Sequence, residues 1–131
     1  MTLDEVLSIL EGRLVTPGLS LDCPIMMGCG ADLMSDVLAF THSGTLLLTG
    51  LVNPQVVRTA EMADILAIVF VRGKIPPAET VSLAVEKGIP LVATRLTLYE
   101  ACGRLYQAGL PSCGVFDLGA DTWRTAFESR S

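Results

Sequence analysis

The chain has 131 residues, of which 50% are hydrophobic and 18% are charged, and it carries a net charge of −5. This length fits one domain, which buries roughly two thirds of the surface that its unfolded chain would expose. The acidic balance leaves no basic patch to neutralise phosphates, which excludes nucleic acid as a partner. The longest apolar run, residues 65–71, is shorter than the roughly 20 residues that cross a bilayer, so no membrane association is predicted.

The composition also predicts association with another protein. The mean hydropathy of +0.54 is high for a soluble domain, and we expect part of the surface to pack against a second copy, as a homodimer, or against a partner. Residues 1–5 lack the basic region and apolar segment that begin a secretory signal. A cytoplasmic location is therefore predicted.

The first predicted element is a helix over residues 2–11. Thr2 and Glu5 have the spacing of a capping box, and Leu3, Val6, Leu7 and Leu10 fall on one helical face. Gly12 is predicted to end this helix, and a short extended piece over residues 13–16 follows.

Strands and helices then alternate. Three apolar runs end in glycine, at Gly30, Gly50 and Gly73, and a helical segment follows each of them. The predicted strands cover 25–29, 45–49, 66–71 and 90–93. Four helices are predicted between and after these strands: residues 32–42, a segment after Pro54, a segment from Pro76-Pro77 to Gly88, and residues 98–108. In the first of them, Met34, Val37 and Leu38 are predicted to face inward. In the last, the residues predicted to face inward are Leu98, Ala101, Cys102, Leu105 and Tyr106.

This alternation predicts an α/β fold. Parallel strands need crossover connections, and the crossovers place helices over the faces of the sheet. We expect a three-layer domain with a mainly parallel sheet of about four to five strands and helices on both faces.

Several segments resemble the DRTGG domain family. They are Ala31 to Val37, the apolar strand leading into Arg72 to Pro76, Lys87 to Val92, Tyr99-Glu100, and Gly103 to Tyr106. The likeness covers residues 2 to about 110, so the domain is assigned to 1–110 and a C-terminal extension to 111–131. At the places that name the family, this chain has Leu51-Val52-Asn53-Pro54 and Val71-Arg72-Gly73.

The resemblance implies a non-catalytic regulatory module similar to the N-terminal domain of HPr kinase. In that family the domain occurs alone, fused to phosphotransacetylase, or beside CBS domains in regulated pyrophosphatases. The implied function is regulation or ligand sensing, and not catalysis.

The turns after the predicted strands supply candidate binding residues. Gly28 and Gly30 allow close approach of a ligand to the backbone, or serve only a tight turn. Asp32 is predicted to cap the next helix, and with Asp36 on the same helical face it can alternatively hold a cation or a ligand hydroxyl. Arg72 and Arg95 each follow a strand, where a guanidinium group can bind a phosphate or carboxylate.

The four cysteines do not have the spacing of a metal site. Cys23, Cys29, Cys102 and Cys113 lack the close pairs of zinc and iron–sulfur sites. We predict reduced thiols that behave as small apolar side chains, with no metal site. No cofactor is indicated.

Two classes of function remain open. In the first, the protein senses an anionic or nucleotide-like small molecule at the carboxyl ends of the strands, where open α/β sheets bind ligands. The predicted site comprises Gly28, Gly30, Asp32, Gly50, Asn53, Arg72, Gly73 and Arg95. In the second, the protein is an assembly subunit of a cytoplasmic metabolic or redox enzyme and uses its apolar surface, including the tail residues Val115, Phe116, Leu118, Trp123 and Phe127.

Overall fold

The computed structural model describes residues 1–114 and 120–128. It contains a five-stranded sheet in the order β1-β5-β4-β3-β2. The strands are β1 (Arg13–Leu14), β2 (Met27–Gly30), β3 (Thr45–Thr49), β4 (Ala67–Phe70) and β5 (Leu91–Ala93). The helices are α1 (Leu3–Leu10), α2 (Met34–Phe40), α3 (Pro54–Met62), α4 (Ala78–Lys87), α5 (Leu98–Gln107) and α6 (Ala120–Glu128).

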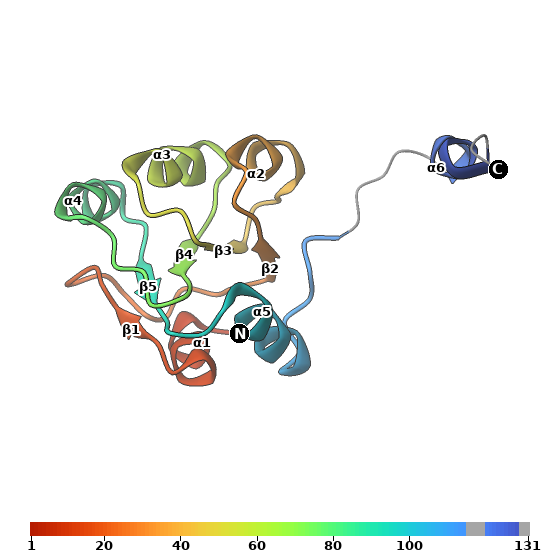
Figure 1. Ribbon diagram of the computed structural model, residues 1–131. Coiled ribbons are helices and arrows are strands. Elements are labelled where there is room, and N and C mark those ends of the chain that lie inside the picture. Colours follow the sequence, from red (N-terminus) through yellow and green to blue (C-terminus); the bar gives the residue numbers. More distant parts are fainter. Residues whose placement is uncertain (115–119, 129–131) are drawn as a thin grey trace.

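The sheet lies between two layers of helices. Figure 1 shows α2, α3 and α4 over one face and α1 and α5 over the other. Strands β2 to β5 pair in parallel, and β1 pairs antiparallel with β5, with Arg13 opposite Ala93. The predicted three-layer α/β fold is confirmed, and the extended piece that follows α1 is the short edge strand β1.

The central strands are buried on both faces. Every residue of β3 and β4 is buried, which is why these segments read as unbroken apolar runs. Alternate residues supply two cores: Leu46, Leu48 and Val69 pack toward α1 and α5, while Leu47 and Ile68 pack toward α2, α3 and α4.

Local signals place several helix ends correctly. The Glu5 N–H donates to the Thr2 hydroxyl at 3.3 Å, as the capping box predicts. Gly88 ends α4 with φ at +71°, a conformation that glycine adopts without strain. Thr97 caps α5 in the same way as Thr2 caps α1, since its hydroxyl accepts from the Glu100 N–H at 3.2 Å.

The prediction that Gly12 ends α1 is wrong. The helix ends at Leu10, and Glu11 adopts the left-handed conformation with φ at +51°. Gly12 instead allows the chain to enter the sheet, because a Cβ there would lie 3.0 Å from Val92 Cγ1 and 3.1 Å from the Ala93 carbonyl oxygen.

Two residues predicted to face inward are exposed. Leu38 on α2 is 47% exposed and Tyr106 on α5 is 70% exposed. Both helices lie beside the edge strand β2 (Figure 1), so the sheet does not extend beneath their full apolar faces. Periodicity identifies such a face but not where the sheet beneath it ends.

The chain after α5 returns to the sheet edge. The Gly28 N–H donates to the Pro111 carbonyl at 2.9 Å, and the Cys113 N–H donates to the Gly28 carbonyl at 3.0 Å. Helix α6 stands apart from this body (Figure 1). The tail residues Val115, Phe116 and Leu118 lie outside the described residues. Within the described ranges, no helix has the length and apolar character needed to cross a membrane.

Candidate functional site

Asp32 joins the turns that follow β2 and β3. Its Oδ1 accepts hydrogen bonds from the Gly50 N–H at 2.8 Å and from the Thr49 hydroxyl at 3.0 Å. The predictions that Asp32 caps α2 and shares a helical face with Asp36 are wrong, because α2 begins at Met34 and Leu33 is its N-cap residue. The carboxylate turns toward the neighbouring strand, where two donors satisfy it.

Arg72 approaches the same point from the end of β4. Its Nη2 lies 3.1 Å, and Asp32 Oδ1 lies 3.7 Å, from the position that a Cβ of Gly50 would occupy. Any side chain at residue 50 would therefore meet the guanidinium group. The absence of a side chain at Gly50 lets a cation and a carboxylate approach the same backbone position.

The turn that carries Arg72 is joined to the turn that carries Arg95. The Arg72 N–H donates to the Leu96 carbonyl at 2.7 Å, and the Gly73 N–H donates to the Thr94 carbonyl at 2.9 Å. Arg72 has φ at +61° and Gly73 has φ at +69°. The side chains of both arginines are exposed, so both cations stand at the carboxyl rim of the sheet.

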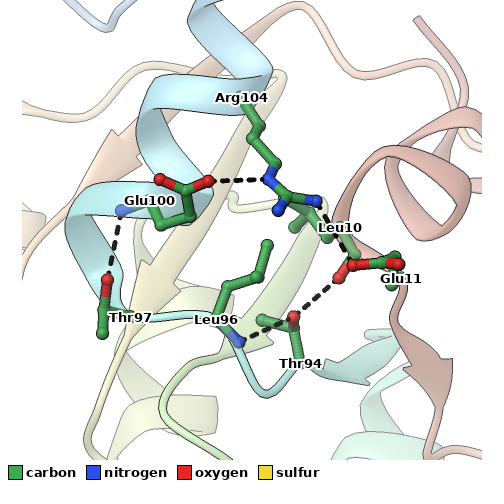
Figure 2. A network of polar contacts seen from close by, with 7 residues as sticks. All are labelled: Leu10, Glu11, Thr94, Leu96, Thr97, Glu100 and Arg104. Carbon is green, nitrogen blue, oxygen red and sulfur yellow. Dashed lines mark hydrogen bonds and ion pairs between the residues drawn. The ribbon is translucent and has the colours of Figure 1, made fainter.

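Thr94 fixes the turn that presents Arg95. Its buried hydroxyl donates to the Leu10 carbonyl at 2.7 Å and accepts from the Leu96 N–H at 3.2 Å (Figure 2). Beside it, Arg104 of α5 donates to Glu100 at 3.0 Å and to Glu11 at 3.3 Å (Figure 2). These contacts connect the end of α1, the end of β5 and the start of α5.

Asn53 completes the polar groups at this rim. It is exposed and precedes α3, and its carboxamide makes no capping hydrogen bond within the part of the chain that the structure describes. The side chain is therefore available at the helix start. The rim thus presents one carboxylate, one carboxamide and two guanidinium groups.

Gly28 and Gly30 line a groove of about 400 Å³ between β2 and α5. A Cβ at Gly30 would lie 2.9 Å from Cys102 Sγ, and one at Gly28 would lie 3.2 Å from Leu110 Cδ2. These two glycines allow α5 and the chain that follows it to pack closely against the edge strand. The Cβ positions of these two glycines face α5 and the chain that follows it, whereas the Cβ position of Gly50 faces Arg72 and Asp32.

The groove was not predicted from the sequence. Its other lining residues are mainly apolar or aromatic: Leu48, Tyr99, Glu100, Cys102, Gly103, Leu105, Tyr106, Leu110, Pro111 and Ser112. The sequence feature that could have indicated the groove is Gly103. Glycine weakens a helix, and this one stands between two tyrosines, Tyr99 and Tyr106, on one face of the predicted helix.

Cys29 lies in β2, and Cys102 and Cys113 lie beside this strand. Burial and a hydrogen bond with Cys113 raise the pKa of the Cys29 thiol to about 12. Burial also raises the pKa of Cys23 and of Cys102. Among the described residues, no three histidine, cysteine or acidic side chains form a group that would hold a metal ion. A raised pKa keeps these thiols protonated at neutral pH.

Comparison with solved structures finds a match that covers 99% of this chain. It is to the CBS and DRTGG domains of the regulatory region of Clostridium perfringens pyrophosphatase, with a TM-score of 0.63 and 16% sequence identity. The chain shares this fold. It covers 61% of the length of that chain, whose structure was determined in complex with the activator diadenosine tetraphosphate. The match is consistent with the resemblance to a DRTGG domain.

Comparisons of the sequence add no relative. No family model matches the chain, and no curated protein matches it. The shared fold and the geometry of the rim are therefore the grounds on which a function can be inferred.

Proposed function

We propose that the protein is a non-catalytic regulatory domain that binds an anionic, nucleotide-like small molecule at the carboxyl rim of its sheet. The observation that supports this most directly is the approach of Asp32 and Arg72 to Gly50, within a few ångströms of one backbone position. The fold match to a regulatory region, and not to a catalytic domain, supports a role in binding.

The rim offers complementary groups for two parts of such a ligand. Guanidinium groups bind phosphate through paired N–H donors, so Arg72 and Arg95 suit the phosphate. Asp32 uses Oδ1 for the Gly50 N–H and the Thr49 hydroxyl, and its other oxygen can accept from a sugar hydroxyl. A nucleotide carries both a phosphate and a sugar hydroxyl, whereas inorganic phosphate carries only the first. The regulatory region with the same fold is bound to a dinucleotide activator, which favours this ligand class.

The proposed test is a thermal-shift screen of the full chain with nucleotides, acyl phosphates and coenzyme A compounds. A ligand that binds only the folded state raises its apparent stability. We expect a nucleotide-class ligand to raise the melting temperature. Replacing Arg72 or Arg95 by alanine is expected to weaken its binding about tenfold or more, since hydrogen bonds to charged groups contribute about 1.5–3 kcal/mol.

Arg58→Ala is the matched control. Arg58 is exposed on α3 and lines a second surface groove, between α3 and α4. This variant removes the same charge from a side chain outside the proposed site, so long-range electrostatic effects will appear in it too. Unchanged affinity in the Arg72→Ala/Arg95→Ala double variant would refute the rim as the binding site.

A second candidate function rests on the exposed apolar surface. Tyr99 and Tyr106 beside the groove are 89% and 70% exposed, which suits an assembly subunit that contacts a cytoplasmic metabolic or redox enzyme. If the screen finds no ligand and the protein co-purifies at fixed stoichiometry with one such enzyme, this second function replaces the first.

A further inference from the structure

The chain that follows α5 pairs in parallel with the edge strand β2 through an isolated bridge. Gly28 and Ser112 are the residues paired in this bridge. The Gly28 N–H donates to the Pro111 carbonyl at 2.9 Å, and the Cys113 N–H donates to the Gly28 carbonyl at 3.0 Å. Because the two segments run in the same direction from this pair, the next position along each of them brings Cys29 beside Cys113.

This register gives the two cysteines the separation that a disulfide needs. Neighbouring strands lie about 4.7–4.9 Å apart, and the Cα atoms of a disulfide are usually about 4.4–6.8 Å apart. Side chains at neighbouring positions of paired strands also point to the same face of a sheet. The thiols of Cys29 and Cys113 share a hydrogen bond, so the two sulfur atoms are already neighbours in the reduced protein.

Cys102, the other cysteine beside β2, lies on the opposite face of the sheet. A Cβ at Gly30 would lie 2.9 Å from the Cys102 Sγ, so Gly30 faces α5. Successive residues of a strand face opposite sides of the sheet, and Cys29 pairs with Leu47, which packs toward α2, α3 and α4. The thiol that Cys29 can bond to is therefore that of Cys113.

We propose that Cys29 and Cys113 form a reversible disulfide, which fastens the chain beyond α5 to the edge strand β2 when the protein is oxidised. Both thiols are free and half-buried in this structure, so a small disulfide in solution can reach them. The backbone attachment described above consists of two hydrogen bonds. A covalent bond beside them would hold this segment against β2 more tightly than the reduced protein does.

A low-molecular-weight disulfide such as glutathione disulfide is the oxidant. The sulfur of Cys113 attacks one of its sulfur atoms, forms a mixed disulfide and releases one glutathione thiolate. The sulfur of Cys29 then attacks the Cys113 sulfur, forms the protein disulfide and expels the second glutathione thiolate. Each released thiolate takes up the proton that one protein thiol has lost. Two protein thiols are thus oxidised by two electrons, and one glutathione disulfide is reduced to two glutathione molecules.

The different environments of the two thiols set the order of these attacks. Burial and the hydrogen bond with Cys113 raise the pKa of the Cys29 thiol to about 12, and the thiolate is the reactive form of cysteine. Cys113 therefore meets the oxidant first, and its conversion to a mixed disulfide removes one cause of the raised pKa of Cys29. The attack by Cys29 is then intramolecular, and well-oriented groups of one molecule react as if present at about 10⁵–10⁸ M.

The experiment equilibrates the full-length protein in mixtures of reduced and oxidised glutathione, blocks the free thiols with a maleimide, and identifies the products by mass spectrometry. We expect two of the four thiols to be lost together, with a cross-link between the tryptic peptides that contain Cys29 and Cys113. Dithiothreitol should restore both thiols. Hydrogen exchange of the Gly28 and Cys113 amides, followed by NMR, should be about tenfold slower or more in the oxidised protein.

Cys113→Ser should abolish both the cross-link and the slower exchange at Gly28. Cys102→Ser is the matched control on the opposite face of the sheet and should retain both. Cys23→Ser should also retain them, and this variant assigns the cross-link to Cys29, because Cys23 and Cys29 lie in one tryptic peptide.

Four outcomes with the wild-type protein would refute the proposal, even if a variant fails to fold. They are a cross-link through Cys102, a disulfide between two copies, a product that remains a mixed disulfide with glutathione, and four free thiols in excess oxidised glutathione. Equal amide exchange in the oxidised and reduced proteins would refute the fastening of the chain to β2. None of these results bears on ligand binding at the rim.

Discussion

Asp32 Oδ1 accepts the Gly50 N–H at 2.8 Å, and this single contact couples the turns of two adjacent parallel strands. Because Asp32 lies just after β2 and Gly50 just after β3, the bond holds together the rim to which Arg72 also comes. It gives Asp32 a structural role beside its proposed role in ligand binding, and the two roles can be separated.

Replacing Asp32 by alanine should destabilise the fold by about 1–2 kcal/mol, because the Gly50 N–H and the Thr49 hydroxyl lose their acceptor. Urea denaturation measures this change in the free energy of unfolding. Asp22→Ala removes the same charge from an exposed loop residue and should have little effect. Asp32→Asn keeps an acceptor oxygen and should recover most of the stability. Equal stability of the two alanine variants would contradict the structural role.

Two glycines that face the same groove should respond to alanine in opposite directions. At Gly30 a Cβ would lie 2.9 Å from Cys102 Sγ and 3.3 Å from Leu98 Cδ1, and overpacking of this kind destabilises a protein by about 1–3 kcal/mol. At Gly103, inside α5, the described residues leave open space. Gly103→Ala should therefore stabilise the fold by about 0.5–1 kcal/mol through its higher helix propensity. Thermal unfolding of the two variants measures both signs, and two changes in the same direction would contradict the packing described for β2 and α5.

Thr94 should matter more for stability than the ion pairs that surround it. Thr94→Val retains the volume of the buried side chain but leaves the Leu10 carbonyl and the Leu96 N–H without their hydroxyl partner. We expect a loss of about 1–3 kcal/mol. Arg104→Gln breaks only exposed ion pairs with Glu11 and Glu100, and its smaller effect should disappear in high salt. Denaturation at low and high salt tests this ranking, which fails if Arg104→Gln is the more damaging variant.

Cys29 should make the fold sensitive to alkaline pH. Burial and its hydrogen bond with Cys113 raise its pKa from the ordinary value of 9.0 to about 12, so the folded state disfavours the thiolate. The resulting stability is fully present below pH 9.0 and is lost progressively as the pH rises from there toward about 12.

The measurement is urea denaturation between pH ~8 and pH ~10.5. The free energy of unfolding of the wild type should fall more steeply with pH than that of Cys29→Ala. Parallel curves would mean that Cys29 does not have the predicted raised pKa. The half-buried thiols Cys23 and Cys102 contribute a residual slope to both proteins, so the difference between the curves isolates Cys29.

The sequence alone determined the order of the elements and the layer architecture. The short, unbroken apolar runs of β3 and β4, each followed by a glycine turn, indicated strands buried on both faces, and helices between parallel strands must cross over the sheet. Thr2 and Gly88 marked helix ends because capping is a local property of the chain. The glycine turns pointed to the carboxyl rim, where the structure places Gly50 and Arg72 together.

Tertiary structure decided what no local pattern encodes. Asp32 has the sequence position of a helix cap, but two donors from the neighbouring strand hold its carboxylate, and that neighbour follows only from strand order. Leu38 and Tyr106 are exposed because the sheet ends beneath their helices. Gly30 ends an apolar run in the sequence as Gly50 and Gly73 do, yet it belongs to β2, a Cβ there would face α5, and the residue lines the groove. Periodicity reports which residues share a face of one element, whereas the partner of that face depends on how distant elements pack together.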